Sequence, residues 1–490
     1  MYTLPILALA AALPTALSQS SNSETILGVY MFHRHGDRTA KITAPANLTD
    51  LGYRQVYDSG SYYRSRYIDS GADFRISGIN PDAVLQSQLQ VSSPIDDVLQ
   101  NSATGFLQAL YPPVGSELDA EELRNGSTVT APMQGYQLIP IGVAESGTGS
   151  EDSTWLQGTS DCAKAEVSSN EYFVSDEYRR LYDSTRDFYR NLLPVISGMF
   201  SEDDATFENA YEIWDYINVA TIHNNTIPSA SLLTDRTLFQ LRTLADAQQF
   251  ALAYNASTPI RAVTGMTLAA QITQFLNDSL STAGSFSGQR LGIQFGAYAT
   301  FASFFGLAQL PEVNEDFTGV TDYASSMVFE MFTNASKTDY SPEDVFVRFL
   351  YHNGTASESD PPTEYPLFGT GENALAWNDF MENMNAFSLG DTGAWCTACG
   401  NSTGECAAYV NDNNDDGSSA GSALSSEEST GCSNGVSPAV NGVIGAMVTL
   451  AVVLGLEALV LVVFGLRVVS KKRLAQGAGR VVGGGEEMKG

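Results

Sequence analysis

The sequence HRHGDRT, residues 33–39, contains the residue types needed to bind and transfer a phosphoryl group. The imidazole of His35 can attack phosphorus as a nucleophile. Arg34 and Arg38 carry guanidinium groups, which bind phosphate oxygens in bidentate fashion. Gly36 lies between them and allows the backbone to approach a ligand closely. This segment therefore predicts a phosphate site with a histidine nucleophile.

An apolar run from Ile26 to Phe32 comes directly before this segment and predicts the strand that positions it. The run is short for a helix, and its residues are typical of a buried strand. In an open α/β sheet, ligands bind beyond the carboxyl ends of the strands. We therefore expect His35 at the carboxyl end of a buried strand.

The residues RHGDRTA, 34–40, resemble the RHGxRxP signature of the histidine acid phosphatases, the branch of the histidine phosphatase superfamily that includes phytases. Thr39-Ala40 replaces the usual ending in Pro. Residues 48–67, 102–113 and 345–355 resemble the family's first helix, second helix, and last strand and turn. The resemblance implies that His35 is phosphorylated, that Arg34 and Arg38 bind the phosphate, and that no metal or other cofactor is needed.

The fold class expected from this resemblance is α/β, a histidine-phosphatase-like (phosphoglycerate-mutase-like) α/β/α sandwich with a helix-rich cap. We expect a strand, loop and helix over residues 26–69, a helix near 93–110, and strands beginning at 291 and 345. Aromatic residues and Leu recur at helical spacing after about Ser175. The cap is therefore expected mostly within residues 120–260.

One phosphate ligand of the family has no counterpart here. The resemblance implies an Arg in the second helix, and Val98 stands at or next to that position. Ser93 is expected as the N-cap of this helix and Pro94 as its first residue. Ile95 and Val98 then share its apolar face. We therefore expect Val98 in the core, without contact to phosphate.

The family's second signature, a strand ending in His-Asp whose Asp protonates the leaving alcohol, is also altered. The matching strand is 291–295, and Ala297 and Tyr298 stand where His-Asp is expected, before a helix over 301–307. Tyr298 could donate a hydrogen bond, but a phenol with a pKa near ~10 is a poor acid at low pH. His223 and His352 are interpreted as solvated or structural histidines.

Asp37, inside the signature, is the nearest alternative acid, and two interpretations of it stay open. It could replace the missing acid and protonate the leaving group. Alternatively, it could form an ion pair that orients Arg34 or Arg38.

Two functions are compatible with this pattern. The first is an acid phosphatase of the secretory pathway or cell surface that hydrolyses phosphomonoesters through a phosphohistidine intermediate. The second is a catalytically impaired glycoprotein that binds an anionic ligand or a wall or membrane partner. The Arg34, His35 and Arg38 cluster favours the enzyme, whereas Val98 and the 297–298 pair favour the binding protein. The substrate cannot be named from these residues.

The charge distribution and the two ends of the chain predict an exported, anchored protein. The 490 residues carry a net charge of −31, which argues against a nucleic-acid-binding surface. Residues 1–18 are typical of a signal peptide, and the ectodomain is expected over 19–409. An acidic Ser/Gly-rich stalk, 410–441, precedes an apolar run, 442–466, long enough to span a bilayer. The basic tail, 467–490, places the C-terminus in the cytoplasm, a type I topology.

The cysteines and glycosylation sequons agree with export. An exported compartment favours disulfides over a zinc site for five cysteines, and their odd number leaves one thiol over. Eight N-x-S/T sequons are spread over the predicted ectodomain. They begin at Asn47, Asn125, Asn224, Asn255, Asn277, Asn334, Asn353 and Asn401.

Overall fold

The structure is a computed structural model that describes residues 24–409 except 119, 145–161, 286 and 337–339. The predicted signal peptide, stalk, membrane span and cytoplasmic tail lie outside these residues. No helix within the described part of the chain is long and apolar enough to cross a membrane.

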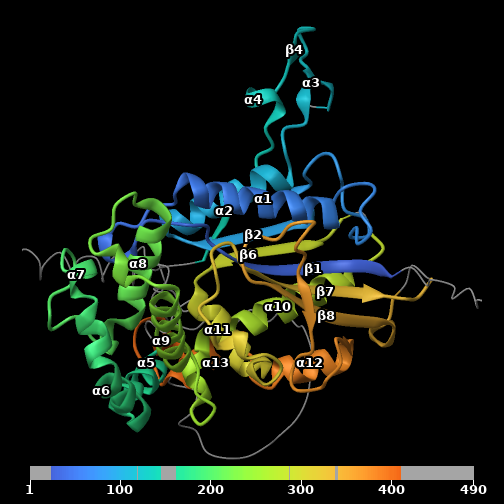
Figure 1. Cartoon of the computed structure of the whole chain (residues 1–490). Coiled ribbons are helices and arrows are strands. Elements are labelled where there is room, and N and C mark those ends of the chain that lie inside the picture. The colour runs from blue at the N-terminus through green and yellow to red at the C-terminus, as the bar shows by residue number, and fades with distance from the viewer. Residues whose placement is uncertain (1–23, 119, 145–161, 286, 337–339, 410–490) are drawn as a thin grey trace, which may run out of the picture. The chain divides into compact units, whose positions relative to one another are not determined.

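A mixed β-sheet forms the centre of the described chain (Figure 1). Its strand order is β10-β8-β7-β1-β6-β2-β5, and β9 pairs with β8. The strands are β1 (Thr25–Arg34), β2 (Leu89–Pro94), β5 (Gly142–Ala144), β6 (Leu291–Gly296), β7 (Ser326–Thr333), β8 (Val345–His352), β9 (Thr363–Tyr365) and β10 (Ala374–Ala376). The strands predicted at 26, 291 and 345 are thus all present.

The central strand β1 is parallel to β6 and antiparallel to β7. Its last residue, Arg34, lies opposite Gly296, the last residue of β6. The segments that follow these two strands therefore leave the sheet at the same edge. This register brings residues 35–38 beside residues 297–298, although the two segments are far apart in sequence.

Helices cover both faces of the sheet, as expected for an α/β sandwich (Figure 1). One face packs against α1 (Asp50–Tyr67) and α2 (Asp97–Leu110) through a core that includes Val56, Phe106 and Phe295. The opposite face packs against α10 (Val263–Ser281), α11 (Tyr298–Leu307) and α12 (Trp377–Asn385) through a core that includes Phe304 and Phe329. Both faces of β1 are thus buried, which explains its continuous apolar run.

A third hydrophobic core belongs to a group of helices beside the sheet. These helices are α5 (Ala163–Asn170), α6 (Asp176–Asn191), α7 (Leu193–Ile196), α8 (Ala210–His223) and α9 (Asp235–Ala253). Trp214 and Tyr211 of α8 and Leu241 of α9 are buried in it. Tyr298 of α11 joins the same core and so connects these helices to the sheet edge.

A separate arm extends from the sheet between α2 and β5 (Figure 1). It contains α3 (Gly115–Leu118), α4 (Pro132–Gly135) and the paired strands β3 (Glu121–Glu122) and β4 (Thr128–Val129). Leu118, Met133 and Leu138 expose 65–75% of their surface there. This arm comes before residue 175, after which the helical spacing is expected, and it is largely irregular.

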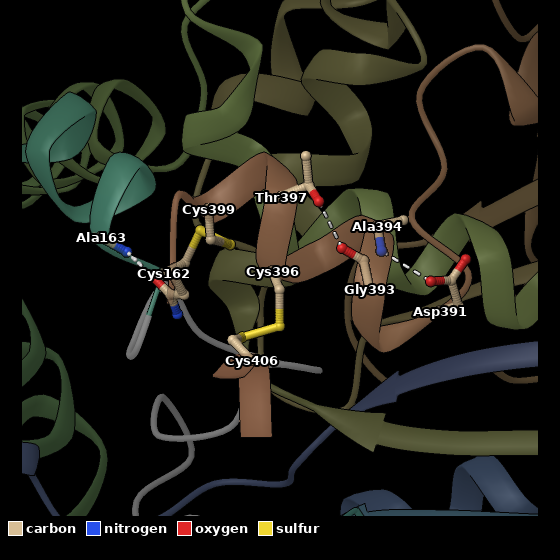
Figure 2. Close-up of a disulfide and its surroundings, with 10 residues drawn as sticks. Cys162, Ala163, Asp391, Gly393, Ala394, Cys396, Thr397, Cys399 and Cys406 are labelled. Atoms are coloured by element: carbon tan, nitrogen blue, oxygen red, sulfur yellow. Dashed lines mark hydrogen bonds between the residues drawn. A yellow bond between two sulfur atoms is a disulfide. The ribbon is translucent and has the colours of Figure 1, made fainter. Parts of the chain in front are cut away.

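Two disulfides confirm the prediction from the cysteines (Figure 2). Cys162, which precedes α5, is bonded to Cys399 at the end of α13 (Thr392–Cys399), 237 residues later. Cys396 is bonded to Cys406, ten residues later. All four cysteines are buried. Cys432, the fifth, lies outside the described residues.

The start of α2 differs from the prediction. Ser93 and Pro94 are the last two residues of β2, where they pair with β5, so they cannot begin the helix. Asp96 is the N-cap, because its side chain accepts a hydrogen bond from the backbone N–H of Leu99. Ile95 consequently lies before the helix with 51% of its surface exposed, not on its apolar face.

Candidate active site

The loop after β1, residues 35–40, is called the signature loop below. It is held against the first turn of α1 and against α2. The backbone N–H of Thr49 donates to the carbonyl of Asp37 at 3.0 Å. The N–H of Gly36 donates to the hydroxyl of Ser102 on α2. A Cβ atom at Gly36 would overlap the carbonyl group of Gly52, so only glycine allows this close approach. Gly36 therefore allows the loop to pack directly against Gly52 of α1, and this contact fixes the backbone of the loop.

His35 is held in the tautomer that a nucleophile needs. Its Nδ1 lies 2.7 Å from the carbonyl oxygen of Gly36. A carbonyl only accepts, so Nδ1 carries the hydrogen, and in the neutral ring Nε2 carries the lone pair. The residue is fully buried, and its backbone carbonyl accepts from the N–H of Ala324 at 2.8 Å. An Nε2 with a lone pair has the form that a nucleophilic histidine requires.

Arg34 is buried beside two tyrosine rings. Its guanidinium donates to the carbonyl of Thr321, and its backbone N–H donates to the carbonyl of Ser325. The guanidinium carbon lies 4.8 Å from the ring centre of Tyr323 and 5.4 Å from that of Tyr298. Its Nε has no hydrogen-bond partner among the described residues. The side chain is thus held at a fixed place while this donor is left for an anion.

Arg38 forms a buried ion pair with Asp215 of α8. Its Nη1 lies 3.1 Å from both carboxylate oxygens, and the two side chains are 2% and 1% exposed. Its Nη2 donates to the hydroxyl of Tyr211 at 3.2 Å. Asp215 also accepts from the backbone N–H of Lys41. This carboxylate therefore orients Arg38 and also offsets part of the positive charge of the site.

The ring of Tyr323 contacts all three signature side chains. Its centre lies 5.6 Å from that of His35, 4.8 Å from the guanidinium of Arg34 and 6.0 Å from that of Arg38. Burial raises the pKa of Tyr323, and the two arginines oppose this increase. Its phenol therefore stays neutral, and the ring forms one wall of the site.

Ala297 and Tyr298 lie where the parallel register of β1 and β6 places them, beside Arg34. Ala297 is fully buried as the N-cap of α11, so α11 begins three residues before the predicted helix. The hydroxyl of Tyr298 donates to the side-chain carbonyl of Gln249 at 2.8 Å. Its ring packs on Tyr211, with centres 4.9 Å apart. Neither residue offers a carboxylic acid at this position.

Val98 is 2% exposed in α2, which confirms its prediction as a core residue. Its side chain cannot bind phosphate.

The carboxyl of Asp37 faces His223, not the arginines. Its Oδ1 accepts from the hydroxyl of Thr49 at 2.5 Å and from Nε2 of His223 at 2.6 Å. Its Oδ2 is buried with no hydrogen-bond partner among the described residues. The interpretation of Asp37 as an ion-pair partner of Arg34 or Arg38 is therefore wrong, because Asp215 takes that role for Arg38.

His223, interpreted as solvated or structural, is the last residue of α8, and its ring connects that helix to the signature loop. His352, by contrast, is a buried residue at the end of β8, 3.8 Å from Asp360. One feature of the sequence indicates a contact from α8. Asp215 is an acid on the apolar face of a helix, where a lone charge needs a partner.

A pocket of about 300 Å³ adjoins the signature loop. Its lining residues are Thr39, Ala40, Thr43, Thr49, Tyr216, Val219, Ala220, His223 and Asn224. A larger pocket, of about 540 Å³, lies along η3 (Glu171–Val174) and α9, and no signature residue lines it. In the described part of the chain, no group of three His, Cys, Asp or Glu side chains could hold a metal ion.

The fold and the cluster of Arg34, His35 and Arg38 are those expected of the histidine phosphatase superfamily. Residues 39–352 match the model of the histidine phosphatase superfamily, branch 2, and the chain belongs to this family. The matched range begins directly after Arg38.

Among curated proteins, the chain is 25% identical to bovine prostatic acid phosphatase over 352 residues, covering 68% of this chain and 79% of the relative. It is 24% identical to the human prostatic acid phosphatase, covering 70% of this chain and 82% of the relative. The phytase of Citrobacter braakii has a similar fold, with a TM-score of 0.50, 12% identity, and coverage of 76% and 99% of the two chains.

Proposed function

We propose that this protein hydrolyses phosphomonoesters through a phosphohistidine intermediate at His35. The observation that carries the proposal is the hydrogen bond from Nδ1 of His35 to the Gly36 carbonyl, which leaves the lone pair on Nε2. Arg34, the last residue of β1, and Arg38, in the loop that follows, lie on either side of the nucleophile in sequence and neutralise the charge that develops on the phosphoryl oxygens. The reaction is the transfer of a phosphoryl group from an alcohol to His35 and then to water.

Two functional groups that the resemblance to the family implies are missing from this chain, and their absence lowers the expected rate of hydrolysis. The missing Arg at Val98 and the missing acid at Ala297-Tyr298 remove one charge contact and one proton donor. General acid catalysis contributes about 10²–10⁴-fold. Esters with good leaving groups, such as aryl phosphates, need this proton least. We therefore expect aryl phosphates to be the best substrates.

The experiment is hydrolysis of p-nitrophenyl phosphate by purified residues 19–409, measured from pH 3 to 8, with His35→Ala beside the wild type. The proposal requires turnover by the wild type and loss of at least about 10³-fold in the variant. Equal rates for the two proteins would contradict it.

A second candidate function, binding of an anion without catalysis, is favoured by a specific observation. The hydroxyl of Tyr298 donates a hydrogen bond to Gln249, and the side chain of Ala297 is buried. The two residues at the position of the second signature therefore make structural contacts and provide no acid. Phosphate binding by calorimetry, together with no turnover of any ester at any pH, would select this function.

We further propose that the protein is exported and held by one membrane helix over residues 442–466, with a cytoplasmic C-terminus. Two buried disulfides support an oxidising compartment. Of the eight sequon asparagines, six are exposed, which glycosylation requires: Asn47, Asn125, Asn224, Asn277, Asn334 and Asn353. Removal of N-glycans should lower the apparent mass of the full chain made in a eukaryotic secretory host. An unchanged mass would contradict the placement.

A further inference from the structure

The buried carboxyl of Asp37 and the imidazole of His223 form a pair that joins the signature loop to α8. The two residues are 186 positions apart in sequence. Because the carboxylate oxygen accepts, Nε2 of His223 carries the hydrogen and the ring is oriented by Asp37. Asp37 is fully buried, whereas the His223 side chain is 32% exposed. A ligand can therefore contact the imidazole of His223 but not the carboxylate of Asp37.

His223 also lines the 300 Å³ pocket whose wall begins at Thr39, the residue after Arg38. The other ring nitrogen, Nδ1, makes no hydrogen bond with the described residues, whereas the hydroxyls of Thr43 and Thr49 are already engaged. A histidine oriented by a buried carboxylate, with its second nitrogen uncommitted in a pocket, is the arrangement of a general acid and base.

We propose that His223 supplies the proton for the leaving alcohol, in place of the acid missing at Ala297-Tyr298, and that the alcohol occupies the pocket lined by Thr39 and His223. This inference rests on the proposed phosphatase function. The pocket lining contains no Lys, Arg, Asp or Glu, so the alcohol it accepts is uncharged.

In the first step, Nε2 of His35 forms a bond to phosphorus as the bond from phosphorus to the ester oxygen breaks. The protonated ring of His223 gives its Nδ1 proton to that oxygen, which leaves as a neutral alcohol. In the second step, a water oxygen bonds to phosphorus and the phosphorus–nitrogen bond breaks. The neutral His223 takes one proton from that water, which returns both histidines to their starting state.

The test compares an alkyl ester, glycerol 2-phosphate, with an aryl ester, p-nitrophenyl phosphate, in wild type and His223→Gln. We expect kcat for the alkyl ester to fall about 10²-fold or more, and kcat for the aryl ester to change less than about fivefold, because a phenolate leaves without a proton. Asp37→Asn should reduce the alkyl rate selectively as well, since it removes the negative charge that supports the protonated ring of His223.

Ile222→Ala is the matched control, because Ile222 is the preceding residue of α8, is 43% exposed and does not line the pocket. It should leave both rates unchanged. Equal losses for the two esters in His223→Gln, or no loss for either, overturn the inference. The proposed function fails separately, if turnover of the aryl ester survives His35→Ala.

Discussion

Nη1 of Arg38 lies 3.1 Å from both carboxylate oxygens of Asp215, and both side chains are almost completely buried. The pair connects the signature loop to α8 across 177 residues of sequence. A buried charge that loses its partner is strongly destabilising, whereas the intact pair adds little net stability. The main effect of this contact is therefore to hold the Arg38 side chain at one place.

We predict that Arg38→Ala and Asp215→Ala each lower the free energy of unfolding by about 3–5 kcal/mol, because each leaves one buried charge unpaired. The double variant should lose clearly less than the sum of the two. Urea unfolding of the four proteins measures this interaction energy. Additive losses would show that the two charges do not depend on each other.

A second prediction concerns the ring of Tyr323, which packs on both guanidiniums and on His35. Tyr323→Leu should weaken phosphate binding by about 0.5–2 kcal/mol, the range of a cation–π contact. Tyr323→Phe should bind like the wild type, because the ring and not the hydroxyl makes the contact. Calorimetry with inorganic phosphate measures both.

Tyr57→Leu is the control for this experiment, because Tyr57 is an exposed residue of α1 that packs on Tyr53, outside the site. A Phe variant as weak as the Leu variant would show that the hydroxyl of Tyr323, not its ring, holds the anion.

A third prediction follows from His33, which is buried at the end of β1 and whose pKa is lowered to about 4, chiefly by desolvation. Its Nδ1 donates to the carbonyl of Arg34, and its Nε2 accepts from the hydroxyl of Ser59. In the unfolded chain, histidine has a pKa of about 6.5. Between these two values the unfolded state binds more protons, so stability falls as the pH falls.

The stability that His33 contributes is complete above about pH 6.5 and lost progressively down to about pH 4, a total of about 3 kcal/mol. His33→Gln should be less stable than the wild type at pH 7, but the difference should shrink toward pH 4. Thermal unfolding of both proteins across this range checks the slope. A difference that does not vary with pH would contradict the assignment to His33.

The two disulfides allow a comparison within one chain. In the chain-entropy model, the bond Cys162–Cys399, whose cysteines are separated by 237 positions in sequence, stabilises the fold by about 5 kcal/mol. The bond Cys396–Cys406, with a separation of ten, contributes about 2–3 kcal/mol. Replacing each pair by alanines should therefore lower Tm more for the first pair. The opposite order would show that local packing, not loop closure, dominates.

The parts of this site that depend on neighbouring residues in the sequence could be predicted, because a short motif or an apolar pattern indicates each of them. The apolar run before His35 predicted β1. The resemblance to the family's second signature predicted Ala297 and Tyr298 at the end of the strand at 291, and the register of β1 and β6 places them beside the signature. Val98 could be placed in the core because the apolar face of α2 is regular. The start of α2 could not, since Ser93-Pro94 resembles a helix cap and only the pairing of β2 with β5 shows that it is strand.

The contacts that Asp215 and His223 of α8 make with the signature loop could not be predicted from local sequence patterns. Asp215 and His223 reach the signature loop only because helices 163–253 form their own core and present this side of α8 to it. Which carboxylate pairs with which base is then decided by packing. That is why the sequence leaves two interpretations of Asp37 open and does not show that its partner is His223, to which it is hydrogen-bonded.

The most direct test of the account is to trap the intermediate. The purified protein is mixed with a ³²P-labelled aryl phosphate, quenched in alkali, digested and mapped. A phosphohistidine intermediate at His35 should give alkali-stable, acid-labile label on the peptide that contains His35, and none in His35→Ala. Turnover of the ester without label on His35, or label that persists in the variant, would contradict a phosphohistidine mechanism at this residue.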